Sequence, residues 1–190
     1  MDVKERYLKN KGFTLLELII TLVILGILAV IALPKFINYK SNANQSLIQG
    51  VGAAIKTGLD LANARIQIDN ADSSIDYLGN TIQLTAGQPT ASAGTLRALL
   101  DIEVPTSWTR IWKTVPCAEL EFCILGNMYP GKSNYVPVPG YDLTGSFVGE
   151  NRVAYIWPKG YLLETDGCYS FYINNASTNS VYSGSITDGC

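Results

Sequence analysis

Glu17 and the cysteines are the side chains whose type and setting can do chemistry in this chain. Glu17 is the only ionisable residue in the apolar run from Phe13 to Leu33. A charged side chain costs roughly 2.5–3.5 kcal/mol at the centre of a membrane helix, so a carboxylate in such a run indicates a functional site. The sequence contains no histidine, which removes the usual general base and the commonest metal ligand.

The other residue patterns argue against catalysis and against nucleic-acid binding. Without histidine, neither a Ser-His-Asp nor a Cys-His site can form. No phosphate-binding loop, dinucleotide fingerprint or EF-hand loop is present. The net charge of −2 provides no basic field for nucleic acid. We therefore expect no enzyme activity, no cofactor and no specific nucleic-acid partner.

The 4 cysteines all follow the apolar run. An even number of cysteines in an exported chain predicts disulfides. Of the three possible pairings, we favour Cys117–Cys123 with Cys168–Cys190, because these two disulfides close the shortest loops. Zinc is the alternative, but the spacings do not match short C-x2-4-C knuckles and no histidine can complete a site. Asp166 and Asp188 adjoin glycines and are candidates for a calcium site, although turn formation explains them better. We expect no metal.

The apolar run is long enough to cross a membrane. Phe13 to Leu33 spans about 30 Å as a helix. Four basic residues precede it, which favours a cytoplasmic N-terminus: Lys4, Arg6, Lys9 and Lys11. A conventional signal peptide has a shorter apolar core and an A-x-A-like site. A plain single-pass anchor would explain the length, but neither alternative explains Glu17 or the placement of Gly12 directly before the run.

We expect the helix to continue beyond the membrane, over residues 13–64. Its second half, 34–64, places apolar or small residues on one face at steps of three and four: Phe36, Tyr39, Ala43, Leu47, Val51, Ala54, Gly58 and Ala62. We predict core contact on one side of this half and contact with other copies on the other side. Pro34 predicts a kink because it lacks an N–H, and Gly26 lowers the helix propensity.

Residues 65–190 are expected to form one globular head domain. Ser74–Leu84 suggests a hairpin around Gly79-Asn80, and Gly94–Leu100 a short helix with Leu96, Leu99 and Leu100 inward. Antiparallel strands are predicted at 107–115, 120–125, 152–157, 161–164 and 168–174. Asn174–Gly189 has a loop composition. These elements predict an α+β fold in which a long N-terminal helix packs on an antiparallel sheet.

The motif G-F-T-L-x-E, followed by the apolar run, resembles the processing site of type IV prepilins. In that family, a membrane peptidase cuts after the glycine that matches Gly12 and methylates the new terminus, here Phe13. Residues 1–12 would then be the leader and 13–33 the anchor. The glutamate that matches Glu17 neutralises the terminal amine of a neighbouring subunit during assembly. Gly26 and Pro34 match positions where the family helix loosens or bends.

The resemblance also implies an architecture and a function. Cys168–Cys190 is similar to the C-terminal disulfide loop of type IV pilins, and the Cys-Tyr-x-x-Tyr segment at Cys168 is similar to the mannose-sensitive haemagglutinin type. The expected protein is a structural subunit that is held in the inner membrane and polymerises into a helical filament for attachment, with motility or aggregation as further uses. Its partners would be copies of itself, the prepilin peptidase and the inner-membrane assembly machinery, with an unknown receptor. The alternatives are a pseudopilin of a type II secretion system and a membrane-anchored binding domain.

Overall fold

The computed structural model describes residues 13–102, 113–118, 120–143 and 151–190, and of residues 33–38 it describes the backbone alone. The chain forms two compact units, Met1–Ser41 and Asn42–Cys190. The elements run in the order α1 (Leu15–Asp69), β1 (Ser74–Tyr77), β2 (Asn80–Thr85), β3 (Gln88–Pro89), α2 (Ala93–Leu100), β4 (Phe122–Met128), β5 (Arg152–Pro158), β6 (Tyr169–Asn175) and β7 (Ser180–Ile186). This arrangement confirms the predicted α+β class.

The helix α1 contains 55 residues and passes Pro34 without a break in its assignment. It extends past Ala64, the predicted end, and its last turn carries an ion pair between Arg65 and Asp69 with an N–O distance of 2.7 Å. Asn70 then adopts a positive φ of 47°, which ends the helix as a left-handed residue does.

The buried side of α1 differs from the stripe that the periodicity singled out. In the second unit the helix buries Ile48, Ile55, Leu59 and Ala62. Phe36 of the predicted stripe has no described side chain. Most of the other stripe residues are exposed, including Tyr39, Leu47 and Ala54, whereas Gly58 and Ala62 are buried. Both sides of this helix carry apolar residues, so the period alone could not show which side the head covers.

The first sheet is small and antiparallel, in the order β1-β2-β3. The predicted hairpin is present, but its turn lies at Leu78-Gly79, one residue earlier than expected, and Asn80 already pairs with Tyr77. Both turn residues have positive φ values, 50° and 77°. This is the combination that a tight two-residue hairpin requires, and Gly79 meets it without a steric penalty.

The second sheet is an antiparallel meander in the order β4-β5-β6-β7. Strands β4, β5 and β6 correspond to predicted strands, but two expectations were wrong. Residues 161–164 form a loop and a turn, and Ser180–Ile186 is a full strand that pairs with β6 from Tyr169↔Ile186 to Asn175↔Ser180. Of the strand expected at 107–115, residues 107–112 lie outside the described part and 113–115 form a turn and a bend.

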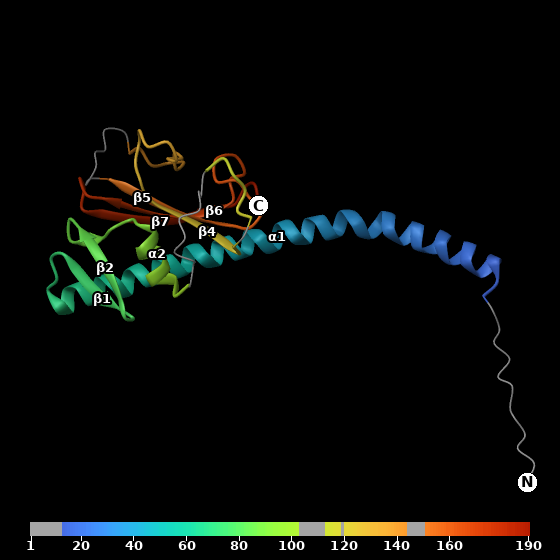
Figure 1. Cartoon of the computed structure of the whole chain (residues 1–190), viewed down its shortest axis with the longest axis horizontal. Coiled ribbons are helices and arrows are strands. Elements are labelled where there is room, and N and C mark those ends of the chain that lie inside the picture. The colour runs from blue at the N-terminus through green and yellow to red at the C-terminus, as the bar shows by residue number, and fades with distance from the viewer. Residues whose placement is uncertain (1–12, 103–112, 119, 144–150) are drawn as a thin grey trace, which may run out of the picture. The chain divides into compact units, whose positions relative to one another are not determined.

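The central strands of the second sheet, β5 and β6, are buried on both faces. Successive side chains of a strand point to opposite faces, so they enter two different cores. Ala154, Ile156 and Tyr172 face α1, α2 and the first sheet. Val153, Tyr155 and Trp157 face a second core, which is closed by loop residues such as Val138 and Leu163. Figure 1 shows β4–β7 lying alongside the part of α1 that belongs to the second unit. The head therefore holds α1 through one face of this sheet.

The short helix α2 begins at Ala93, and Ser92 caps it by accepting a hydrogen bond of 3.0 Å from the Thr95 backbone N–H. Leu96 and Leu99 are buried as predicted, whereas Leu100 is only half-buried. The loss of an Ncap hydroxyl typically costs about 1 kcal/mol, so Ser92 contributes to fixing this helix against α1.

Candidate functional site

The described residues of the first unit form an exposed apolar helix. The window Leu15–Ala32 has 18 residues, a mean hydropathy of 2.9 and 0% of its residues buried. By length and composition it can cross a membrane, and it is the one helix in the described part of the chain that can. Its large side chains have no cover within the subunit, so the helix needs lipid or other protein around it.

Glu17 has a partner that the sequence analysis missed. Its carboxylate accepts hydrogen bonds of 2.9 Å from the backbone N–H of Thr14 and 2.9 Å from the Thr14 hydroxyl. The Thr14 hydroxyl in turn accepts a hydrogen bond of 3.2 Å from the Glu17 backbone N–H. This is the reciprocal pattern of a capping box, and the spacing Thr-x-x-Glu was its readable signal. Glu17 therefore starts the helix, whatever else it does.

The proposed processing site lies at the edge of the described part. Gly12 is outside the described residues, and Phe13 is exposed, two residues before α1 begins at Leu15. Gly26 lies within the exposed span, and a Cβ at this position would meet nothing within 4 Å. Pro34 lies within the helix, and the kink expected there stays a prediction. Of these residues, the structure brings together only Glu17 with its neighbour Thr14.

The structure contains the disulfides Cys117–Cys123 and Cys168–Cys190. The Tyr161 hydroxyl connects their surroundings, because it donates a 2.8 Å hydrogen bond to the Cys190 carbonyl and accepts one of 2.8 Å from the Asn44 side chain. The Cys117 N–H also donates to the Tyr161 carbonyl at 3.1 Å. One tyrosine thus connects both disulfide loops to α1.

Asp166 acts as a turn residue in this part of the head. Its carboxylate accepts hydrogen bonds of 2.9 Å from the Leu162 N–H and 2.8 Å from the Thr165 hydroxyl. Among the residues that the structure describes, no group of three or more His, Cys, Asp or Glu side chains is placed to hold a metal ion. The arrangement supports the turn interpretation of Asp166.

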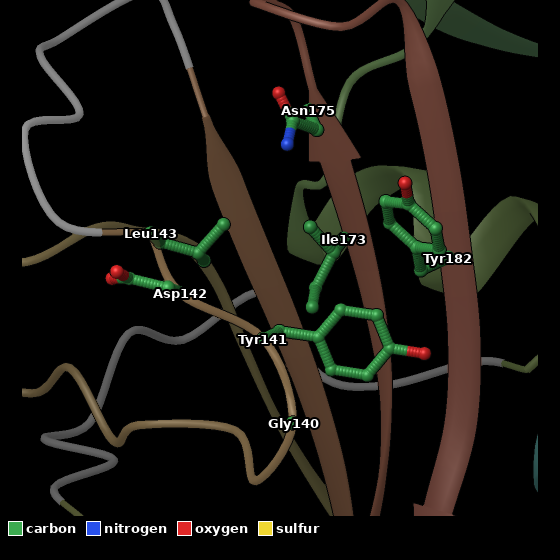
Figure 2. A pocket seen from close by; sticks show the side chains of 7 residues that line it. All are labelled: Gly140, Tyr141, Asp142, Leu143, Ile173, Asn175 and Tyr182. Carbon is green, nitrogen blue, oxygen red and sulfur yellow. The ribbon is translucent and has the colours of Figure 1, made fainter.

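A polar pocket of about 310 Å³ lies between β6, β7 and residues 140–143, which come before β5 in the chain. Figure 2 shows its lining, in which the rings of Tyr141 and Tyr182 lie next to each other and the Asp142 carboxylate points away from them. The two ring centroids are 5.1 Å apart, and the Tyr141 ring also meets Phe171 edge-on at 5.5 Å. The pocket offers aromatic faces and the amide of Asn175, groups that can stack and form hydrogen bonds.

Buried tyrosines of the second sheet have raised pKa values. Burial, with a smaller contribution from nearby Tyr135, raises the pKa of Tyr169 to about 12. Burial also raises the pKa of Tyr155, whose hydroxyl donates to the Val136 carbonyl, and that of Tyr172, whose hydroxyl donates to the Pro89 carbonyl. The Tyr155 hydroxyl holds the loop at Val136 against the second sheet, and the Tyr172 hydroxyl connects that sheet to β3, so both have a structural role.

Comparison with known proteins identifies the N-terminal segment. Residues 7–33 match the family described as "Prokaryotic N-terminal methylation motif". The chain is 40% identical over 58 residues to the type IV narrow pilus major component PilA5 of Thermus thermophilus. It is 37% identical over 84 residues to the type IV major alpha-pilin of Moraxella bovis, and 30% identical over 104 residues to the type IV major fimbrial protein FimA of Dichelobacter nodosus.

These matches cover 30%, 42% and 52% of this chain and 50%, 53% and 64% of the three relatives, respectively. No solved structure matches the chain. The assignment to the mannose-sensitive haemagglutinin type stays a prediction. The methylation motif and the pilin relatives agree with the long exposed helix and the disulfide-closed α+β head: over its N-terminal part the chain is similar to type IV pilins, and it spans less than two thirds of the length of these relatives.

Proposed function

We propose that this chain is the repeating structural subunit of a type IV pilus and polymerises through α1 into a surface filament. The observation that carries the proposal is the apolar window Leu15–Ala32, of which 0% is buried within the subunit. A helix of this kind is stable only in lipid or among other apolar helices. The precursor would be held in the inner membrane, and the assembled subunit would lie in an extracellular filament used for attachment.

We divide the chain into a leader (1–12), a helix (13–64, with the anchor at 13–33) and a head domain (65–190). The prepilin peptidase would cut after Gly12 and methylate Phe13, and the inner-membrane assembly machinery would then add the subunit to the filament. A glycine before the cut suits this reaction, because it has no Cβ to hinder an extended backbone in the peptidase.

Glu17 would pair with the α-amino group that cleavage creates on Phe13 of a neighbouring copy. That amine is largely cationic at neutral pH, and both charges would lie in an apolar environment, where an unpaired charge is costly. The capping hydrogen bonds to Thr14 leave this role open, because a carboxylate has about four acceptor sites. The pairing would set the axial register of the filament.

A pseudopilin of a type II secretion system is the second candidate. The disulfide Cys168–Cys190 counts against it, because the major pseudopilins that resemble pilins usually lack this loop and bind calcium instead. Attachment through the head would use exposed polar and aromatic groups. The pocket that contains Tyr141, Asn175 and Tyr182 is one place on the described surface where such groups meet.

The proposal is tested on filaments sheared from the cell surface. Their main protein should be this chain, and its intact mass should correspond to a mature N-terminus at Phe13 with one added methyl group. The variant Gly12→Asp should remain uncleaved and form no filaments. A mature protein that begins beyond Leu33, or sheared filaments without this chain, would contradict the proposal.

Two variants of Glu17 separate its charge from its capping role. Glu17→Gln keeps an acceptor for the capping box but removes the charge, whereas Glu17→Val removes both. We expect both to insert and to be cleaved, and neither to form filaments at more than a trace. Normal filament yield from Glu17→Gln alone would leave Glu17 as a cap, and normal yield from Glu17→Val would remove the assembly role altogether.

A further inference from the structure

A tight turn directly after β4 brings Lys132 back against the end of that strand. The Lys132 backbone N–H donates a hydrogen bond of 3.1 Å to the Tyr129 carbonyl. Between them lie Pro130 and Gly131, whose φ is 96°, and this Pro-Gly pair is what a type II turn favours. The turn places the Lys132 ammonium 5.3 Å from the centroid of the Tyr129 ring and 2.9 Å from the Asn127 carbonyl, to which it donates a hydrogen bond.

Asn127 holds a second cation beside Lys132. It lies where the pairing of β4 with β5 is irregular, it has a φ of 57°, and its N–H donates a hydrogen bond of 2.8 Å to the Ala91 carbonyl. Its side-chain carbonyl accepts a hydrogen bond of 3.3 Å from Nη1 of Arg152. Irregularities of this kind redirect the groups of a strand. Here one fixed residue holds an ammonium and a guanidinium next to each other.

No carboxylate neutralises these two cations among the residues that the structure describes. The ion pairs in the described part of the second unit use Arg65, Lys113 and Lys159, with N–O distances of 2.6–3.8 Å. The guanidinium of Arg152 makes one hydrogen bond, and its buried Nε has no partner. Partial burial and, to a smaller extent, the charge of Arg152 lower the pKa of Lys132. The two like charges are therefore close enough to repel each other.

The remaining donors define what this pair of cations can bind. An ammonium has three donors and a guanidinium five, and neither has an acceptor. Lys132 is exposed, and each of the two side chains donates to Asn127 once. The complementary group is thus a negatively charged oxygen, and hydrogen bonds between ions are about twice as strong as those between neutral groups. The contacts with Asn127 and Tyr129 already hold both cations in place, so a ligand would not have to order them.

We propose that Lys132 and Arg152 form a binding site for an oxyanion group, that is, a carboxylate, sulfate or phosphate. Such a group is carried by free anions and by acidic polysaccharides. The site shares no residue with the pocket that contains Tyr141 and Tyr182. It goes beyond the proposed function, because binding by a single subunit requires no filament.

The test titrates the full-length chain in detergent and follows the side-chain signals of ¹³C-labelled lysine and tyrosine by NMR. The probes are sodium sulfate, sodium phosphate and an oligouronate, each compared with sodium chloride at the same ionic strength. At least one probe should shift the signals of Lys132 and Tyr129 to saturation and leave that of Lys159 unchanged. Lys132→Gln and Arg152→Gln should weaken binding roughly tenfold or more, as followed at Tyr129, whereas Lys132→Arg should retain it.

Lys56→Gln is the matched control, because it removes the same charge from another exposed site and should bind as the unmodified chain does. The melting temperature should stay unchanged in all variants, since Lys132 is exposed and Arg152→Gln keeps a donor for Asn127. Saturation by sulfate or phosphate alone supports the site and identifies a free anion as its ligand, and saturation by the oligouronate supports it and identifies an acidic polysaccharide. Equal shifts with chloride, or equal affinities for Lys132→Gln and Lys56→Gln, would overturn the proposal. Neither result depends on filament formation, so the proposed function is judged separately.

Discussion

Residues Leu15–Ala32 and Ile48–Ala62 belong to the same helix, but they use apolar side chains in different ways. The first stretch is exposed along its whole length, whereas the second buries Ile48, Ile55 and Leu59 against the head. The second stretch is also tied by hydrogen bonds, because the Ile48 carbonyl accepts from the hydroxyls of Ser170 at 2.7 Å and Ser185 at 3.1 Å. Burial thus divides one helix into a part that stabilises the subunit and a part whose apolar side chains need lipid or other protein around them.

The largest expected difference between the two stretches comes from truncating an apolar side chain in each. Ile55→Ala should lower the free energy of unfolding of the head by about 2–5 kcal/mol, because Ile55 is fully buried and a cavity would remain. Leu22→Ala, at an exposed site of the span, should leave it unchanged. Chemical denaturation of the full-length chain in detergent, followed by near-ultraviolet circular dichroism, measures both. Equal losses for the two variants would contradict the division.

The disulfides sharpen the comparison within the head. Cys168–Cys190 closes a separation of 22 residues and Cys117–Cys123 one of 6. In the chain-entropy model these stabilise by about 3 and about 2 kcal/mol, respectively, so Cys190→Ser should cost more than Cys117→Ser. Both variants should also reduce the number of surface filaments. Thermal unfolding shows which variant loses more stability. A larger loss of stability from Cys117→Ser would show that local packing, and not loop length, determines how much each disulfide stabilises the head.

The glycines provide the next contrast. Gly52→Ala should destabilise the head by about 1–3 kcal/mol, because the new methyl group displaces the Ser185 hydroxyl from its position on Ile48. Gly50→Ala should instead stabilise the isolated subunit by roughly 0.5–1 kcal/mol, since it improves helix propensity without a contact. Denaturation midpoints in detergent test the opposite signs. The same sign for both variants would show that α1 is not seated as described.

The smallest effect concerns alkaline pH. The pKa of Tyr169 lies at about 12 in the folded head, above its ordinary value of 10.0, so the folded state retains the proton longer than the unfolded chain. Its contribution to stability is complete below pH 10 and is lost as the pH rises toward about 12. Tyr169→Phe should therefore flatten part of the fall in melting temperature over this range, whereas the exposed-site change Tyr39→Phe should not. An unchanged slope in Tyr169→Phe would assign the alkaline loss to other groups.

Much of the fold was predictable from periodicity and turn residues. The long helix, the first hairpin, α2 and strands β5 and β6 all carry strong local patterns. Strand β7 was not predicted, because its small polar residues have a loop composition. Contacts in the folded head nevertheless require two of these residues, Gly184 and Ser185. A Cβ on Gly184 would lie 2.9 Å from the Phe171 ring, and the Ser185 hydroxyl reaches the helix. Tertiary packing, which no local pattern shows, selected these residues for a strand.

The candidate site was predictable only in part. The motif around Gly12 and Glu17 carries the family resemblance, and the spacing Thr14-x-x-Glu17 is itself a capping-box signal at the start of a helix. The side of α1 that the head covers was not predictable, because Leu47 and Val51 follow the same helical period as Ile48 and Ile55. The choice between these two stripes depends on where the sheet and α2 lie, and that depends on residues more than a hundred positions away, such as Ser170.

Tyr161 gives the head a mechanical property. Its hydroxyl joins Asn44 on α1 to the Cys190 carbonyl, and Cys190 is bonded to Cys168, one residue before β6. If the chain is pulled along α1, force that enters the head through the helix reaches the sheet by this path as well as through the apolar core and the hydrogen bonds from Ser170 and Ser185 to Ile48. The Cys168–Cys190 bond is covalent, so only the two hydrogen bonds at Tyr161 can yield along that path. Along this path, stretching would first break the contact between Cys190 and α1, and the covalent link from Cys190 to β6 would remain intact.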